Sequence, residues 1–347
     1  MNFNVGLALL LAIVLTAPSL SASLENIVKK YDEKFKTFNR EQGPGIAFMV
    51  IKDGKIIHQK GYGYADIEQK LPITTDTLFD LASVSKQFTA MAIAILEEQG
   101  EIDTNQSIRV YLPDLPEYTQ SVKVKHLIHH RSGLSEYTNT LFDEKGRQHI
   151  CNDDIIEYIK TKTSLQFPPN SRFTYCNSNY ALLASIVAKV SGMPFEQFIK
   201  KAIFFPLDMK ASTVLSTATT KEKANLATGY EQWPFFEKCK TLLVDQTAGD
   251  GQIATSLKDF YQWIVGIEES KLVSAKTVEK IFTSTGSQPK ASSGYGYGWG
   301  LREVNGHKVV RHTGGWRGTS TYVAGNREQK LWVVAFSNYE YGLSVYG

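Results

Sequence analysis

The chain has 347 residues, of which 42% are hydrophobic, 12% aromatic and 21% charged. These values are typical of a globular protein with a sizeable core. They exclude a disordered chain, a collagen-like repeat and a small disulfide-stabilised scaffold. The 38 Lys and Arg residues nearly balance the 35 Asp and Glu residues, which leaves a net charge of +3. Because no run of five like charges occurs, the charge pattern gives no indication of nucleic-acid binding.

The N-terminus has the pattern of a secretory signal. Residues 5–17 are apolar apart from Gly6 and Thr16, and small residues follow. This run is shorter than the ~20 residues needed to cross a bilayer, and no other stretch approaches 18 apolar residues. We therefore predict a signal peptide over 1–22 and a domain over 24–347, exported to the periplasm or the cell exterior without a stable membrane anchor. The alternative is a buried N-terminal helix.

The three cysteines are Cys151, Cys176 and Cys239. An odd number leaves at least one thiol free in an oxidising compartment, and the sequence does not indicate which two could pair. No C-x-x-C occurs, so a cysteine zinc site is not expected.

The N-terminal part predicts a helix, a hairpin and a second helix. Apolar residues recur at a helical period after Leu24, and residues 46–63 read as a hairpin around Asp53-Gly54. Residues 83–99 form the strongest predicted amphipathic helix, with Gly100 as its stop.

The rest of the chain divides into a helical middle and a β-rich end. Residues from about 102 to 282 read as helices and loops, including a helix from about Ser178 to Val190. The C-terminal part predicts three antiparallel strands with turns at Asn305-Gly306 and Asn326-Arg327. Strands at both chain ends predict an α+β fold: an antiparallel sheet built from both termini, flanked by helices, plus a helical lobe.

Several motif families are absent from the sequence: G-x-S-x-G, H-E-x-x-H and the Walker A motif do not occur. His126, His129 and His130 form a cluster, but no acidic residue lies at ligand spacing. We interpret the cluster as loop structure and expect no metal site.

The motif Ser83-Val84-Ser85-Lys86 begins the predicted helix at residue 83. Positions i and i+3 share a helix face, so the lysine amine can approach the Ser83 hydroxyl. A serine needs such a base to become a nucleophile, and a helix N-terminus favours developing negative charge. A second S-x-x-K match, Ser287 to Lys290, contains Pro289 and is discarded because proline disfavours the helical geometry.

Two further polar motifs precede predicted elements. Tyr175-Cys176-Asn177 lies just before a helix and supplies a phenol and a carboxamide, whereas the similar Tyr137-Thr138-Asn139 lacks a following helix and ranks lower. His312-Thr313-Gly314-Gly315 lies between two predicted strands, where glycine allows a substrate to lie close to the strand edge. Taken singly, the first motif could be a helix-capping loop and the second a turn.

In this order the motifs resemble the serine β-lactamase and penicillin-recognising family, in the branch of class C β-lactamases, DD-peptidases and related esterases. The similarity extends from about Ile46 to Asn338. It is carried by stretches that include TLFDLASVSKQFTAMAI, VKHLIHHRSGLSEY, FTYCNSNYALLASIVAKVSG and HTGGWRGTSTYVAGN.

The resemblance implies a serine acyl-enzyme mechanism without metal or organic cofactor. Ser83 would attack a carbonyl, Lys86 would help to deprotonate it, and Tyr175 would pass the proton to the leaving group and assist deacylation. The substrate-binding side chains would be those of Asn177, which meets the substrate amide, and of His312 and Thr313, which meet a substrate carboxylate. The N–H groups of Ser83 and Gly315 would form the oxyanion hole.

The sequence departs from the family pattern in several places. His312 stands where class C β-lactamases have lysine, and an imidazole is mostly neutral near pH 7. This favours a peptidase or esterase, although Arg317 could restore positive charge. Cys176 replaces a usual serine and is expected to be a small buried filler. Asp250 interrupts a stretch that is usually alanine followed by glycines, and the closing helix of the family is not found after the last strand.

The expected function is therefore an exported serine acyl-hydrolase that acts on D-alanyl peptides, as a DD-carboxypeptidase does, or on esters. The alternatives are a class C-like β-lactamase and a non-catalytic penicillin- or peptide-binding protein of the same fold. The expected partner is a small-molecule or peptide substrate.

Overall fold

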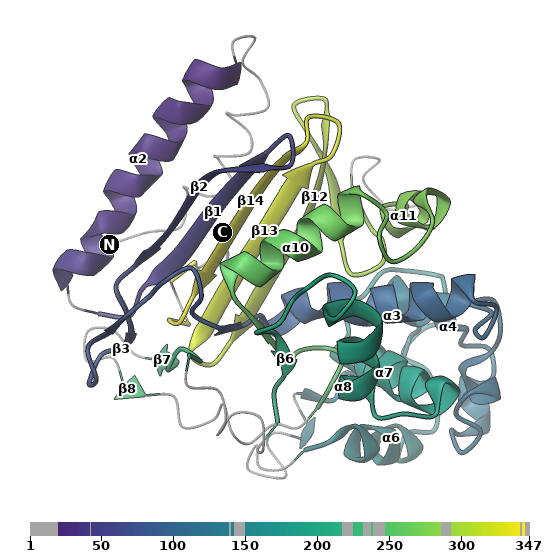
Figure 1. Ribbon diagram of the computed structural model, residues 1–347. Helices are drawn as coiled ribbons and strands as arrows, with labels where there is room; N and C mark the ends of the chain where they lie inside the picture. Colours follow the sequence, from purple (N-terminus) through teal and green to yellow (C-terminus); the bar gives the residue numbers. More distant parts are fainter. Residues whose placement is uncertain are drawn as a thin grey trace.

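The computed structural model describes residues 20–41, 43–138, 140–141, 150–216, 225–231, 237–238, 247–285, 293–340 and 342–343. Its centre is a seven-stranded antiparallel sheet in the order β10-β11-β12-β13-β14-β1-β2 (Figure 1). The strands are β1 (Ile46–Lys52), β2 (Lys55–Tyr62), β10 (Ser293–Tyr295), β11 (Gly300–Val304), β12 (His307–Trp316), β13 (Thr319–Asn326) and β14 (Leu331–Ser337). Because β1 pairs with β14, the two ends of the chain share one sheet, and the predicted α+β fold is confirmed.

Two of the turns predicted from the sequence, at residues 53–54 and 305–306, are present in this sheet, and the structure contains one turn that was not predicted. Asp53-Gly54 and Asn305-Gly306 both have positive φ at each residue, as a two-residue hairpin turn requires. The prediction of three strands after residue 299 is wrong, because four strands lie there. A third turn at Arg317-Gly318, where Gly318 has a φ of 71°, separates β12 from β13.

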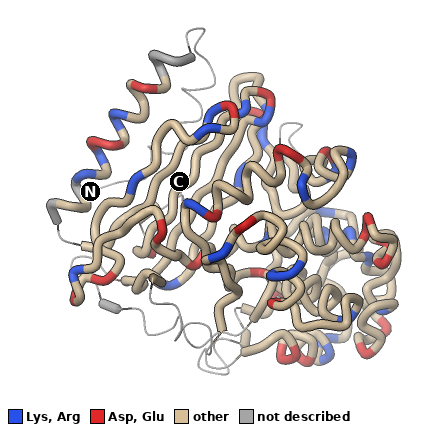
Figure 2. The backbone as a smooth tube through the Cα atoms, in the orientation of Figure 1, with Lys and Arg blue, Asp and Glu red and all other residues tan. Residues whose placement is uncertain are grey.

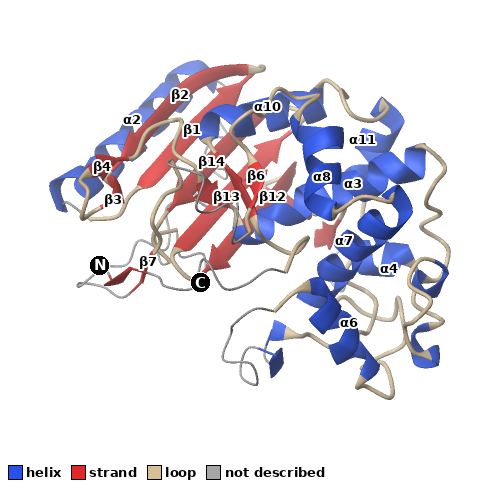
Figure 3. Cartoon of the chain, turned by 60° about the horizontal axis from the view of Figure 1, so that its bottom comes forward, coloured by secondary structure: helices blue, strands red, loops and turns tan. Residues whose placement is uncertain are grey.

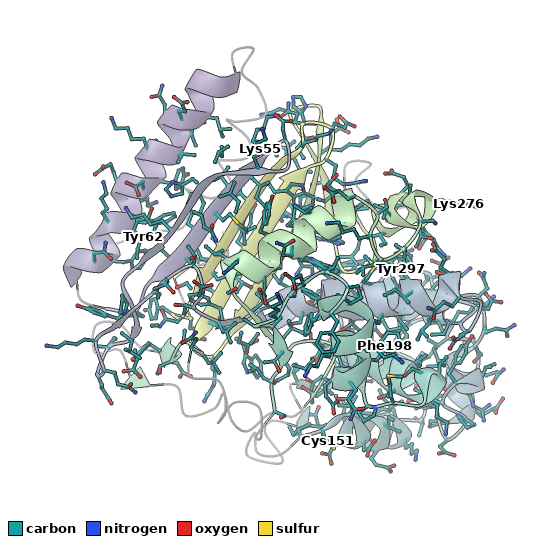
Figure 4. All side chains as sticks on the ribbon, viewed as in Figure 1. Lys55, Tyr62, Cys151, Phe198, Lys276 and Tyr297 are labelled. Carbon is teal, nitrogen blue, oxygen red and sulfur yellow. The ribbon has the colours of Figure 1, made fainter. Side chains whose placement is uncertain are left out.

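Helix α2 (Leu20–Glu41) covers one face of the sheet (Figure 1). Its apolar residues, among them Tyr31 and Phe35, pack with Phe48 of β1. The hydroxyl of Tyr62, the last residue of β2, donates a 2.6 Å hydrogen bond to Asp32 on α2, and Figure 4 shows Tyr62 next to this helix. The helix predicted after Leu24 is confirmed.

The opposite face packs against helices α3 (Lys86–Glu98), α10 (Leu257–Glu268) and α11 (Ala275–Ile281), so the sheet lies between two helical layers (Figure 3). Phe88 of α3 stacks on Trp263 of α10 with ring centroids 4.1 Å apart. Gly100 follows α3 with a φ of 78°, which confirms the predicted stop. Residues 82–85 form a 3-10 turn, η1 (Ala82–Ser85), rather than the first turn of the α-helix.

The helical lobe lies beside the sheet and contains α4 (Val124–Ile128), α6 (Asn152–Lys160), α7 (Asn177–Ser191) and α8 (Phe195–Ile199), which continues into the π-helical turn η4 (Lys200–Phe204). Helix α7 confirms the helix predicted there, and Gly192 ends it with a φ of 68°. The shorter elements are η2 (Ile108–Val110), η3 (Glu117–Thr119), β3 (Tyr64–Asp66), β4 (Leu71–Pro72), β5 (Phe79–Asp80), β6 (Thr213–Val214), β7 (Tyr230–Glu231), β8 (Glu237–Lys238) and β9 (Ile253–Thr255).

Charged residues gather on α2, on the hairpin tips and on the lobe, whereas the strands carry few (Figure 2). Within the described part of the chain, no single helix is long and apolar enough to span a membrane. Two helices, Asn177–Ser191 and Phe195–Phe204, reach that length and composition only together and are bent by 77°. The predicted signal peptide lies almost entirely outside the described residues, which begin at Leu20.

Candidate active site

Ser83 lies where the small strand β5 turns into α3. The preceding residue, Ala82, has a φ of 45°, a conformation that costs an alanine free energy and that the surrounding structure must hold. Asp80 supports it, because its Oδ1 accepts a 2.8 Å hydrogen bond from the Ala82 N–H. Burial raises the pKa of this carboxyl to about 6, although the bond from Ala82 opposes the shift.

Lys86 is the first residue of α3, and its side chain is fully buried at 0% exposure. Its Nζ lies 3.1 Å from the Ser83 Oγ, as the i,i+3 spacing predicts. The same nitrogen lies 2.8 Å from Asn177 Oδ1 and 2.6 Å from the main-chain oxygen of Asp250. Three oxygens therefore surround the amine, and all its hydrogen-bonding capacity is used without a carboxylate.

Tyr175 and Asn177 come from the loop that leads into α7. Asn177 is the first residue of that helix, and its N–H donates to the Glu136 carboxylate. The Tyr175 side chain is 38% exposed, and its ring centroid lies 5.1 Å from Lys86 Nζ. The structure thus brings the Y-x-N motif to the S-x-x-K motif across some ninety residues of sequence, since α7 packs directly on α3.

Strand β12 forms the opposite wall. A Cβ at Gly314 would lie 2.2 Å from the Leu81 oxygen, so only glycine lets β12 run this close to the Ser83 turn. Thr313 is half-buried, and Gly315 is exposed next to this contact. The structure therefore groups the seven sequence-predicted site residues on neighbouring parts of the chain: η1 and α3, the start of α7 that packs on α3, and β12 that packs on η1. These residues are Ser83, Lys86, Tyr175, Asn177, His312, Thr313 and Gly315.

His312 is a neutral group. Its Nδ1 lies 2.8 Å from the main-chain oxygen of Thr313, which can only accept a hydrogen bond, so Nδ1 carries the proton. The other ring nitrogen, Nε2, therefore accepts from the Tyr295 hydroxyl at 2.8 Å. Burial, together with the nearby Lys86, lowers the pKa of His312 to about 3. His312 consequently supplies no positive charge at neutral pH.

A pocket of about 380 Å³ opens beside Tyr175 and His312. Two arginines, Arg302 and Arg311, are among its lining residues, which include no Asp or Glu. Arg317, suggested by the sequence as a source of charge, instead lies 3.9 Å from Glu231.

The competing motifs have other roles or lie outside the described residues. Tyr137 is buried, and its hydroxyl donates a 2.8 Å hydrogen bond to Asp250 Oδ2. Asn139 and the match at 287–290 lie outside the described residues. The interpretation of the histidine cluster as loop structure is correct only for its second half. His126 lies within α4 and caps that helix, because its Nδ1 accepts from the Lys123 N–H. His129 and His130 follow the helix, and the His129 ring donates to the main-chain oxygen of Tyr295. Among the described residues no group of His, Cys, Asp or Glu could hold a metal ion.

Cys176 is the buried filler that the sequence predicts. Burial raises the pKa of its thiol to about 12, so the reactive thiolate does not form at neutral pH. Cys176 and Cys151 are both free thiols, and Cys239 lies outside the described residues.

Four contributors to the site were not predicted: Asp80, Glu136, His130 and the main-chain oxygen of Asp250. Asp250 stood out as a departure, but a main-chain acceptor has no residue signature. Glu136 and His130 belong to one of the stretches that carry the family resemblance, and nothing in that pattern indicated their contacts with residues 174–177.

Comparisons with known proteins agree with this arrangement. The model of the Beta-lactamase family matches residues 24–345. The Bacillus subtilis protein PbpX is 33% identical over 285 residues, which cover 78% of this chain and 68% of that protein. A D-aminopeptidase of Gluconobacter oxydans is 28% identical over 89% of this chain, and the match spans 58% of that longer protein. The octameric penicillin-binding protein homologue of Pyrococcus abyssi superposes with a TM-score of 0.78 at 26% identity, over 91% of this chain and 74% of that one.

The chain belongs to the Beta-lactamase family, the family of serine β-lactamases and penicillin-binding proteins. Within that family it is a serine hydrolase, as its relatives named D-aminopeptidase and penicillin-binding protein indicate.

Proposed function

We propose that this protein is an exported acyl-hydrolase that acts through a Ser83 acyl-enzyme on D-alanyl peptides or related esters. The observation that carries the proposal is the environment of Lys86, a fully buried amine 3.1 Å from the Ser83 hydroxyl and held by two fixed acceptors. A serine becomes a nucleophile when such a base is in hydrogen-bond reach.

The two acceptors orient the base. A neutral lysine amine has two N–H groups and one lone pair. If the N–H groups donate to Asn177 Oδ1 and to the Asp250 oxygen, the lone pair faces the Ser83 Oγ–H. Lys86 then takes the hydroxyl proton as Ser83 Oγ bonds to the substrate carbonyl carbon. The developing oxyanion is stabilised by the N–H groups of Ser83 and Gly315, and one such donor contributes about 10²–10³-fold in rate.

Tyr175 completes the proton path. Its phenol lies over the Lys86 amine and is partly exposed, so it can reach both the base and the substrate. In the first half-reaction the proton passes through Tyr175 to the leaving amine or alkoxide, and the acyl group stays on Ser83. In the second, a water gives a proton to the same groups and attacks the acyl carbon. The bond between that carbon and Ser83 Oγ then breaks, the acid leaves, and Oγ takes up the proton that the water gave.

The pocket beside the site favours a substrate with a free carboxylate. Since His312 is neutral, the complementary charge comes from Arg302 and Arg311, and guanidinium groups bind carboxylates through paired hydrogen bonds. A D-alanyl peptide has such a carboxylate next to its scissile bond. Relatives named D-aminopeptidase and penicillin-binding protein support this substrate class.

The test is intact-protein mass spectrometry with a D-Ala-D-Ala peptide, a p-nitrophenyl ester and a reporter penicillin. We expect an acyl adduct or turnover in the wild type and none in Ser83→Ala. Ser85→Ala is the matched control, because Ser85 is buried in the same turn and its Oγ accepts from the Ile253 N–H. The adduct should persist in this control. Rapid turnover of penicillin alone would favour a β-lactamase, and a folded protein that binds these compounds without any adduct would favour a binding protein.

Export is the second part of the proposal, and it depends on the apolar run at residues 5–17. Expression of the full chain in a bacterial host, followed by N-terminal sequencing of the protein outside the cytoplasm, tests it. We expect a new N-terminus near residue 23. Recovery of only full-length cytoplasmic protein would contradict it.

A further inference from the structure

We infer that His130 is a positioning residue for Tyr175, an inference that rests on the proposed role of Tyr175. His130 binds the main chain on both sides of that tyrosine. Its carbonyl oxygen accepts a 2.9 Å hydrogen bond from the Thr174 N–H, and its ring Nδ1 accepts a 3.1 Å hydrogen bond from the Cys176 N–H. One residue therefore holds the main-chain N–H groups of both neighbours of Tyr175.

The imidazole also supports the Tyr175 ring. The two rings lie with centroids 4.3 Å apart and planes 30° apart. Lys86 Nζ is also near the phenol, at 5.1 Å from its centroid. His130 itself is 0% exposed and is enclosed by Phe173, Tyr180 and Tyr295. Tyr175 is partly exposed, so solvent alone would leave its ring free to move. The buried His130 ring packs against it and holds it next to the Lys86 amine.

The backbone of His130 supports a role beyond filling space. Its φ is 54°, a conformation that non-glycine residues rarely adopt. A glycine would relieve this strain, but it would remove both the Nδ1 acceptor and the ring under Tyr175. The chain therefore holds a strained histidine where its carbonyl and its ring both face one loop.

The state of the ring is consistent with this role. Because Nδ1 accepts from a peptide N–H, the proton of the neutral ring is on Nε2. Burial, assisted by Lys86 and His312, keeps the pKa of His130 well below its usual value. A protonated ring would lose the Nδ1 acceptor, so the neutral form is the one that holds the Tyr175 loop.

His126 offers a matched control. It lies four residues earlier, is also buried, and its Nδ1 also accepts a 3.1 Å hydrogen bond from a main-chain N–H, that of Lys123. No hydrogen bond or ring contact joins it to residues 174–177 in the described part of the chain. His126→Phe therefore removes the same kind of hydrogen bond as His130→Phe without affecting Tyr175.

The experiment is a double-mutant cycle on turnover of a D-alanyl peptide or ester that the wild-type full chain hydrolyses. His130→Phe keeps an aromatic ring but lacks the acceptor, and His130→Asn keeps an acceptor and tolerates the positive φ but lacks the ring. We expect each to lower kcat at least tenfold with little change in KM, whereas His126→Phe stays within about threefold. Combined with Tyr175→Phe, neither should lower kcat further, because residues that act as a unit are not additive.

Additive losses in the cycle would overturn the inference, as would an equal loss of kcat in His126→Phe. If His130→Phe does not fold, the cycle with His130→Asn decides alone. A low kcat in Tyr175→Phe, together with additive losses of kcat when it is combined with a His130 variant, would reject the positioning role. The proposed function would then remain intact. A wild type without Ser83-dependent turnover would overturn both.

Discussion

The Lys86 amine lies 2.6 Å from the main-chain oxygen of Asp250, a residue 164 positions away in the sequence. This contact fixes the amine against the loop before β9, while Asn177 fixes it against α7. The amine is thus placed by three different segments of the chain. Its position depends on the assembled fold and not on the helix alone.

Lys86→Met should abolish acylation. The variant keeps an unbranched side chain that is one atom shorter but removes the proposed base, and general-base catalysis contributes about 10²–10⁴-fold. It also leaves Asn177 Oδ1 and the Asp250 oxygen without their donor. Stopped-flow acylation by the ester measures the loss. Lys276→Met, at an exposed position on α11 (Figure 4), should acylate at the wild-type rate. Acylation of Lys86→Met within tenfold of wild type would reject Lys86 as the base.

Substitution of the two Y-x-N tyrosines should have different effects, one mainly on activity and the other mainly on stability. Tyr175→Phe removes the proposed proton path and should lower kcat well over tenfold, with an unfolding free energy close to wild type because the residue is partly exposed. Tyr137→Phe removes a buried hydrogen bond to Asp250 and should cost about 1–3 kcal/mol of stability with a smaller change in kcat. Urea unfolding and steady-state kinetics on both variants measure this contrast. Equal losses of activity would refute the assignment of Tyr175.

Stability should fall as the pH is lowered from 7 to 5. Burial lowers the pKa values of His126 and His129 to about 4 and that of His312 to about 3. Unfolded histidines bind protons below about pH 6.5, whereas these native ones do not, so their contribution is present above 6.5 and lost towards 4 and 3. Asp80, with a pKa raised to about 6, acts in the opposite direction between about 6 and 3.8.

The histidines outnumber this carboxyl, so we expect a net loss of about 2–5 kcal/mol between pH 7 and 5. Urea unfolding at several pH values measures it. His126→Gln should flatten the pH dependence, because one of the protons taken up on unfolding is removed. A protein that is equally stable or more stable at pH 5 would show that these histidines are protonated in the native state.

The parts of the fold that could be predicted from the sequence are those with local causes. The Ser83–Lys86 contact follows from helical spacing, and the turns at residues 53–54 and 305–306 follow from their Asp-Gly and Asn-Gly pairs. The turn at residues 317–318 has no such pair before its glycine, so the strand count was one too low.

The less predictable parts of the site depend on long-range packing. The meeting of Asn177 with Lys86 was implied only by the family resemblance, because 91 residues separate them. The role of His130 could not be predicted at all. It depends on a left-handed backbone that a histidine cluster does not indicate, and on a carbonyl as much as on the ring.

Substitution of Arg311 by Met should change substrate selectivity. If Arg302 and Arg311 bind the substrate carboxylate, Arg311→Met raises KM for a D-Ala-D-Ala peptide about 10–100-fold. This range is that of a charged hydrogen bond of roughly 1.5–3 kcal/mol. The same peptide with a C-terminal amide lacks the charge, so its KM should change less than about threefold. Arg302→Met should act in the same direction, since both arginines are among the residues that line the pocket.

Arg317→Met is the control for this prediction, because Arg317 lies near Glu231 and outside the lining of this pocket. Its KM for the acid and for the amide should both stay close to wild type. A raised KM for the acid in Arg317→Met, with an unchanged KM in Arg311→Met, would indicate that the substrate carboxylate binds on the Glu231 side of the site. An equal increase in KM for the acid and the amide in Arg311→Met would show that Arg311 supports the shape of the pocket and does not bind the substrate carboxylate.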